Sequence, residues 1–239
     1  MSIELFDVEH LVVSEAPEPP LTPHDAEARD RVWDRAVQDN PALWDGPVVA
    51  CGGLEQPGPR TLHLSWVRVT YRHYALRRVP GATALPSLFV NTIQPTDDGR
   101  MLVVRMSPST AAPGRWQLPG GSVEPPLNET LLDEATLAGQ AARELTEEVG
   151  ISVSAQDLRL WCATRGENNS IGLTYLAPPH PETTLLEAFT EATTAEQNQG
   201  NEPELDRIVL VRTSDDLTGL NGPHADYLSP ITTRFLTCH

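Results

Sequence analysis

Three glutamates share one face of a predicted helix in the middle of the chain, and we call Glu144, Glu147 and Glu148 the glutamate trio. Their i, i+3 and i+4 spacing places the side chains within an arc of about 100° on an α-helix. Like charges at these spacings destabilise a bare helix by a few tenths of a kcal/mol per pair, so the arrangement favours a bound cation. Mg²⁺ is the natural candidate because it takes oxygen ligands and bridges to substrate phosphates, and Mn²⁺ suits the same ligands.

The neighbouring residues predict how this helix is held. An apolar stripe beside the trio would bury the helix against a sheet, and it consists of Ala138, Ala141, Ala142, Leu145 and Val149. Arg143 lies four residues before Glu147 and is expected to pair with that carboxylate and orient it. Gly150 is expected to end the helix as a left-handed cap. A solvated acidic face is the ordinary meaning of clustered glutamates, so the trio alone does not decide the function.

The longer string around the trio favours a functional interpretation. Residues 143–151 read Arg-Glu-Leu-Thr-Glu-Glu-Val-Gly-Ile, and Leu-Pro-Gly-Gly precedes them at residues 118–121. A chance match to the helical string is expected on the order of once in 10,000 chains of this length. Together the two strings resemble the Nudix box, the magnesium-binding loop and helix of hydrolases that cleave nucleoside diphosphates linked to another group. The resemblance implies a metal site made by the trio and the carbonyl oxygen of Gly120.

The box departs from the family pattern in its spacer. Residues 122–142 separate the box glycine from Arg143, which is longer than the family spacer and indicates an insertion. The spacer glutamate of the family would fall on Ala135, counting back from Arg143, or on Leu127, counting forward from Gly121, and neither side chain can bind a metal. Glu129 and Glu134 are candidates to replace it, and each could equally be a loop acid. We expect the insertion to shape substrate access without carrying the chemistry.

Other residues are candidates for the remaining roles at the site. Nudix enzymes often recruit a glutamate from a later loop as a metal ligand or base, and Glu204 and Glu167 lie in such loops. The catalytic candidates are therefore Glu144, Arg143, Glu204 and Glu167. Arginines that flank the glycine loop could hold a diphosphate or form surface ion pairs, and strand aromatics could stack on a base or pack in the core. These substrate-binding candidates are Arg105, Arg115, Trp116 and Tyr175.

Composition excludes several other classes of function. The formal net charge of −16 opposes binding to nucleic acid or to an anionic membrane, so the expected partner is a small nucleotide substrate. The three cysteines form no Cys-x-x-Cys pair, so neither a disulfide framework nor a zinc site is expected. The N-terminus lacks the basic start of a signal peptide, and no apolar run approaches membrane-spanning length. A cytoplasmic location is expected, and the sequence leaves a homodimer open.

The first part of the chain is predicted to form a small α+β domain at residues 1–82. Thr22-Pro23-His24-Asp25 resembles a capping box with proline at the first helical position, so a helix is expected to about Gln38. Asn40-Pro41 should end it, because proline biases the residue before it away from the helical conformation. Strands are expected at residues 48–54 and 62–74.

Residues 83–239 are predicted to form the second domain. A turn at residues 96–99 should join the first two strands as a β-hairpin. The expected strands lie at residues 88–94, 100–106, 116–118, 158–164, 172–177 and 208–211. The expected helices begin near residue 133 and span residues 183–201 and 228–237. This order resembles the α/β/α sandwich of the Nudix fold, with a mixed sheet and an overall α+β class.

Short strings resemble one branch of the family more closely. Asn40-Pro-Ala-Leu-Trp-Asp-Gly46 and Trp116-Gln-Leu-Pro-Gly-Gly-Ser-Val-Glu-Pro125 resemble enzymes that hydrolyse UDP-glucose and UDP-galactose to UMP and a sugar 1-phosphate. The resemblance implies magnesium-dependent hydrolysis of a nucleoside diphosphate sugar, with a glutamate that orients or deprotonates the attacking water. Two alternatives remain: hydrolysis of ADP-ribose, a dinucleoside polyphosphate or a damaged nucleoside triphosphate, or a nucleotide sensor without turnover. The intact trio disfavours the sensor.

Overall fold

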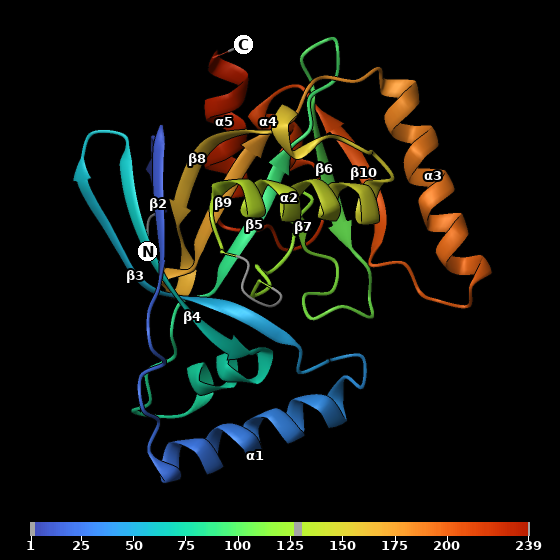
Figure 1. Ribbon diagram of the computed structural model, residues 1–239. Helices are drawn as coiled ribbons and strands as arrows, with labels where there is room; N and C mark the ends of the chain where they lie inside the picture. The colour runs from blue at the N-terminus through green and yellow to red at the C-terminus, as the bar shows by residue number, and fades with distance from the viewer. Residues whose placement is uncertain (1–2, 127–130, 239) are drawn as a thin grey trace.

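Three sheets organise the residues that the computed structural model describes, 3–126 and 131–238 (Figure 1). The first sheet has the order β1 (Glu4–Phe6), β8 (Arg159–Arg165), β9 (Ile171–Leu176) and β5 (Leu88–Ile93). The second has the order β10 (Leu205–Val211), β6 (Met101–Met106) and β7 (Trp116–Gln117). The third has the order β2 (His10–Glu15), β4 (Thr61–Thr70) and β3 (Pro47–Gly58). Because β5 pairs parallel with β9 and β2 pairs parallel with β4, the first and third sheets are mixed.

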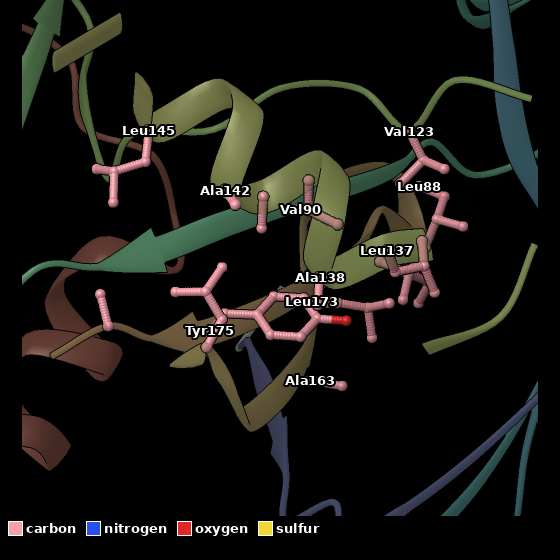
Figure 2. Close-up of a cluster of buried hydrophobic side chains, with 14 of the residues drawn as sticks. Leu88, Val90, Val123, Leu137, Ala138, Ala142, Leu145, Ala163, Leu173 and Tyr175 are labelled. Carbon is pink, nitrogen blue, oxygen red and sulfur yellow. The ribbon is translucent and has the colours of Figure 1, made fainter. Parts of the chain in front are cut away.

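Helices cover both faces of the first two sheets, as the predicted α/β/α sandwich requires. The helices of this part are α2 (Glu134–Val149), α3 (Glu182–Asn198), α4 (Ser214–Thr218) and α5 (Leu228–Cys238). Alternate residues of β6 serve opposite faces: Leu102 shares a buried cluster with α2, and Val103 shares another with α5. Figure 1 shows α2 crossing in front of the strands, and Figure 2 shows Leu137 and Leu145 among the apolar side chains beneath it.

The N-terminal part confirms its predicted helix and corrects one strand. Helix α1 (Pro23–Asp39) begins where expected, because the Thr22 hydroxyl accepts a hydrogen bond from the Asp25 amide at 3.1 Å. Strand β4 ends at Thr70, so the prediction of a strand through residue 74 is wrong. The chain continues there as a 3₁₀ helix, η1 (Tyr71–Arg78). The backbone amide of its second residue, Arg72, donates a hydrogen bond to the carboxylate of Asp45.

The predicted hairpin between β5 and β6 is also wrong. Its turn is present, since the Thr96 amide donates to the Arg100 carbonyl at 2.8 Å, and Gly99 adopts a φ of 83°. Beyond the bridge between Pro95 and Met101, however, β5 pairs with β9, whereas β6 pairs with β10 and β7. Both strands are buried almost throughout, which fits strands that enter two different sheets and not a half-exposed hairpin.

The predicted strands and helices of residues 83–239 are otherwise confirmed, with small shifts at their ends. Strands β1 and β2 and helix α4 are additions that the sequence interpretation did not include. Strand β1 joins the edge of the first sheet by pairing with β8, and Val8 and Leu64 share a core cluster with Leu137 of α2. The division into domains at residues 82 and 83 stays a prediction.

Candidate active site

Helix α2 carries the glutamate trio at a fixed edge of the core. Its first turn is capped by Asp133, whose side chain accepts a hydrogen bond from the Thr136 amide at 2.8 Å. Gly150 ends it in the left-handed conformation with a φ of 79°, as predicted. Leu137 and Leu145 on its apolar face are completely buried. The trio is thereby held next to the glycine loop at residues 118–121.

Glu148 is the most deeply placed member of the trio. Its Oε2 accepts a hydrogen bond from the Gly120 amide at 2.7 Å, and its Oε1 is buried without a partner among the described residues. Gly120 has a φ of 148°, and a Cβ there would lie 2.2 Å from the Val90 carbonyl oxygen. Only glycine therefore lets the loop backbone come this close to the sheet and still donate to Glu148.

Gly121 creates a second close approach of the same loop. A Cβ at this position would lie 2.6 Å from Oε2 of Glu144, so the missing side chain makes room for that carboxylate. The Val90 amide donates to the Gly121 carbonyl at 3.0 Å, which ties the loop to β5. The two box glycines thus contact two carboxylates of the trio in different ways: Gly120 donates a hydrogen bond to Glu148, and Gly121 leaves space for Glu144.

Arg143 lies among three carboxylates and not beside Glu147 alone. Its Nη2 is 3.1 Å from Glu124 and 3.6 Å from Glu144, whereas its Nε is 3.9 Å from Glu147. Gln140, one helical turn before Glu144, grips the backbone of Glu124 through two hydrogen bonds of 2.9 Å. These two hydrogen bonds from the Gln140 side chain fix the loop after the box glycines. Arg143 then forms ion pairs with both Glu124 and Glu144. Gln140 is a site residue that the sequence interpretation missed.

Glu204 joins the trio from a distant part of the sequence. A cavity of about 200 Å³ is lined by Glu144, Glu147, Glu148 and Glu204, together with residues from α3 and the start of β10. The Ser107 amide donates to the Glu204 carbonyl at 2.8 Å, which fixes this residue beside the end of β6. The structure thus brings one of the two predicted loop glutamates to the trio.

Burial and mutual repulsion raise the pKa values of these carboxyl groups. Burial, reinforced by Glu147 and opposed by Arg143, raises the pKa of Glu144 to about 7. Burial and the charge of Glu204 hold the pKa of Glu148 well above its ordinary range. The pKa of Glu204 is raised by burial and by nearby glutamates. A divalent cation would relieve this repulsion and favour the charged carboxylates.

The donor set fits a hard divalent cation. It consists of carboxylate oxygens, and the orphaned Oε1 of Glu148 is a buried acceptor in need of a positive partner. Among the described residues no three acidic, histidine or cysteine side chains already close around one point as ligands. The trio and the Gly120 carbonyl therefore stay the predicted metal ligands.

A larger cavity of about 550 Å³ adjoins this cluster, and Glu204 lines both. Gly120, Arg115 and Asn91 line it near the box loop, and aromatic rings from η1, β5 and the segment before α5 form further parts of its wall. Arg115 donates through Nε and Nη2 to Oε1 of Gln117 at 3.1 and 2.8 Å and forms no ion pair with a described residue. Its guanidinium is therefore held in place without being neutralised.

The remaining predicted site residues lie elsewhere. Arg105 forms a two-point ion pair with Asp206, with both distances 2.7 Å, and does not line the larger cavity. Trp116 and Tyr175 are 1% and 0% exposed, so no ring face is open to a base, and both pack in the core. Glu167 does line the larger cavity.

Of the two candidates for the missing box glutamate, Glu134 is not brought to the trio. Glu134 is exposed in the first turn of α2, ten residues before Glu144, which corresponds to about 15 Å along a helix. Glu129 lies outside the described residues. Ala135, where the family glutamate would fall counting back from Arg143, is also in the first turn of α2, and Leu127 lies outside the described residues.

Comparisons with known proteins give one matching family model and several similar solved structures. The NUDIX domain family model matches residues 90–231, more than half of the chain. Similar solved structures are the MutT protein of Methanosarcina mazei Go1 (19% identity, TM-score 0.41, covering 63% of this chain and 93% of that one) and the E. coli ORF135 protein (21%, 0.36, 58% and 80%). Another is the NUDIX domain of Shewanella oneidensis NrtR complexed with ADP ribose (16%, 0.42, 69% and 95%).

No curated protein matches the chain. None of the described helices is long and apolar enough to cross a membrane. The family match and the box geometry concern the same residues, since the glycine loop and α2 both lie inside the matched segment. The chain therefore belongs to the Nudix family, and it is a Nudix-type pyrophosphohydrolase of a nucleotide derivative.

Proposed function

We propose that the protein is a magnesium-dependent hydrolase of nucleoside diphosphate sugars, with UDP-sugars as the substrate class, and that it releases UMP and a sugar 1-phosphate. One observation carries the proposal: Glu204 lines both the carboxylate cavity and the larger cavity beside it. A diphosphate placed near Glu204 would have its reacting phosphate close to the trio and one of its end groups in the larger cavity. The larger cavity, at about 550 Å³, has the size of an ordinary small-molecule site.

The trio would hold the metal, which supplies polarisation of the phosphoryl oxygens and a lower pKa for the attacking water when it is bound. The chain's own groups position the ligands: the Gly120 amide orients Glu148, and Arg143 holds Glu144. Arg115 is available for the diphosphate, because its guanidinium is oriented by Gln117 and forms no ion pair with a described residue.

Glu204 is the proposed base. Burial raises its pKa toward the working range of a general base, and it lies in the cavity that the trio lines. Water attacks one phosphorus of the diphosphate, Glu204 takes a proton from the water, and the bond from that phosphorus to the bridging oxygen breaks. The oxygen leaves with the second phosphate, so the products are two phosphate monoesters. Glu167 lines the larger cavity but not the cavity that the trio lines, so it is not the proposed base.

Product analysis tests the proposal directly. UDP-glucose, UDP-galactose, ADP-ribose, a diadenosine polyphosphate and an oxidised nucleoside triphosphate would each be incubated with the protein and Mg²⁺. We expect the highest kcat/KM for a UDP-sugar, with UMP and sugar 1-phosphate formed in equal amounts. A higher kcat/KM for any of the other compounds would contradict the assignment of the substrate class, and Glu148→Gln serves as the control for contaminating activity.

A further inference from the structure

The 3₁₀ helix η1 presents one face to the larger cavity. Tyr71, Tyr74 and Arg77 are spaced i, i+3 and i+6, so at three residues per turn their side chains fall on the same face. All three line the cavity, and the Arg77 guanidinium lies 4.6 Å from the centre of the Tyr74 ring. Arg77 forms no ion pair with any residue that the structure describes, so its hydrogen-bond donors are available to a ligand.

Three contacts in the first half of η1 hold it in this position. The Arg72 amide donates to Oδ1 of Asp45 at 2.8 Å, which fixes the first turn. The Leu85 amide donates to Nε2 of His73 at 2.9 Å, which ties the following segment back onto the helix. The Tyr74 hydroxyl donates to the Val49 carbonyl at 3.3 Å, so the ring is anchored to β3. The face is therefore a built part of the cavity wall.

Acidic and hydroxyl groups line the cavity at the same end. The loop between β8 and β9 contributes Glu167 and Ser170, and the segment before α5 contributes Asp226. The Glu167 amide donates to Oδ2 of Asp226 at 2.5 Å, so the two segments are joined. Burial lowers the pKa of Arg77, and the charge of Glu167 is among the causes that oppose this shift. This end therefore combines one guanidinium, two carboxylates and aromatic rings.

Pairing along β5 separates this end from the box glycines. The Val90 amide donates to the Gly121 carbonyl, which places Gly120 beside Asn91. The Ile171 amide donates to the Ser87 carbonyl at 2.8 Å, which places Ser170 at the start of the strand. Ser87 and Asn91 are four residue steps apart along an extended strand, a distance of roughly 13 Å. The end beside η1 is thus well removed from the trio.

We propose that this end of the cavity is the glycosyl subsite, and that Arg77 and Glu167 determine sugar specificity. A hexose offers hydroxyl groups that donate to carboxylates and accept from a guanidinium, and an apolar ring face that packs on an aromatic ring. The two carboxylates would repel a phosphate, which argues against a second phosphate site there. The inference rests on the proposed function and adds to it the N-terminal element that reads the sugar.

Calorimetric titrations with UDP-glucose and with UDP, in the Glu148→Gln background and with Mg²⁺, isolate the contribution of the sugar. The quantity compared is the Kd of UDP divided by the Kd of UDP-glucose. We expect Arg77→Ala to lower this ratio by about tenfold, the effect of one hydrogen bond that involves a charge. Arg78→Ala is the matched control, because Arg78 is the adjacent exposed arginine and does not line the cavity.

Three results would overturn the glycosyl subsite: an unchanged ratio in Arg77→Ala, equal weakening of UDP and UDP-glucose by that substitution, or a ratio near one in the parent. Equal weakening would place the nucleoside at this end. A different result would overturn the proposed function. In that case the protein with Glu148 intact would bind UDP-glucose more tightly than UDP but would release no sugar 1-phosphate.

Discussion

At the scale of single residues, Glu148 combines a structural contact with an unused acceptor. It accepts from the Gly120 amide and keeps a second buried oxygen without a partner among the described residues. Glu148→Gln preserves the shape and the first contact but removes the charge. We expect turnover with Mg²⁺ to fall by at least about 100-fold, as for loss of one electrostatic group at a reacting centre. Turnover near that of the parent would refute the role of the trio, and chelation of the metal should abolish activity in the parent.

The two box glycines predict different consequences for the same substitution. In Gly121→Ala the new methyl meets the end of the flexible Glu144 side chain, which can move. We expect higher Mg²⁺ requirements with little change in melting temperature. In Gly120→Ala the methyl meets the Val90 carbonyl in the backbone, and the φ of 148° is strained for alanine. We expect this variant to melt at a lower temperature, and equal effects of the two substitutions in metal titrations and thermal melts would contradict the argument.

Arg143 is predicted to act through the carboxylates it holds. It lies within 4 Å of Glu124, Glu144 and Glu147 and lines neither cavity. Arg143→Ala should therefore lower kcat more than it raises KM, because substrate contacts are left in place. Arg143→Lys, which keeps a charge but not the planar fork, should recover part of the loss. A rise in KM alone, in steady-state kinetics, would show that Arg143 contacts the substrate.

Sequence spacing predicted the part of the site that lies within one helix. The trio shares a face because the helical repeat depends only on residues close together in the sequence. Gly150 ends the helix because glycine readily adopts the left-handed conformation. Glu204 could only be a candidate, because its approach depends on the pairing of β10 with β6, which no local pattern encodes. Trp116 and Tyr175 were assigned to substrate with core packing as the alternative, and burial decides for the core.

At the scale of elements, the burial of carboxyl groups on α2, with their mutual repulsion, should appear in the pH dependence of stability. The pKa of Glu144 is raised from 4.5 to about 7, so the folded protein keeps a proton that the unfolded chain releases. The stability that this proton contributes is complete below the unfolded value and is lost as the pH rises through the folded one. With a chelator present, we expect the free energy of unfolding to fall between about pH 4.5 and pH 7 in urea titrations.

Two comparisons isolate the carboxyl contribution. Saturating Mg²⁺ should reverse the fall at the higher pH, because the metal takes the place of the protons. Glu144→Gln should reduce the fall in the free energy of unfolding. Burial lowers the pKa of His73, so His73 contributes a pH dependence of the opposite sign, and this contribution is the same in both proteins. A free energy of unfolding that rises over the same interval in the chelated parent would contradict the assigned pKa shifts.

Element types were easier to predict from the sequence than their partners. Capping and periodicity predicted α1 and α2, because these signals lie within a few residues of each other. The β5–β6 hairpin was wrong because a turn signal does not reveal which strand pairs beyond it. Strand β1 has three residues and is stabilised by its pairing with β8, so no period of its own marks it.

At the scale of the whole molecule, the two predicted domains share more than a boundary. The N-terminal part supplies an edge strand to the first sheet and one wall of the larger cavity. Asn40 adds a further link, since its side-chain amide donates to the carbonyls of Ser109 and Thr110 at 3.4 and 3.3 Å. Thr110 itself lines the larger cavity, so the N-terminal part also supports the wall formed by the loop between β6 and β7.

The shared core leads to a prediction about unfolding. Val8, Leu62 and Leu64 belong to the same buried cluster as Leu137 and Leu145 of α2, so separating the two parts would expose apolar surface on both. We therefore expect one cooperative thermal transition, with equal calorimetric and van't Hoff enthalpies, in spite of the division predicted at residues 82 and 83. Leu64→Ala should lower the melting temperature of that single transition, because it opens a cavity in the common cluster. Two resolved transitions, of which Leu64→Ala shifts only one, would show instead that the N-terminal part folds independently and that the shared cluster does not couple the two.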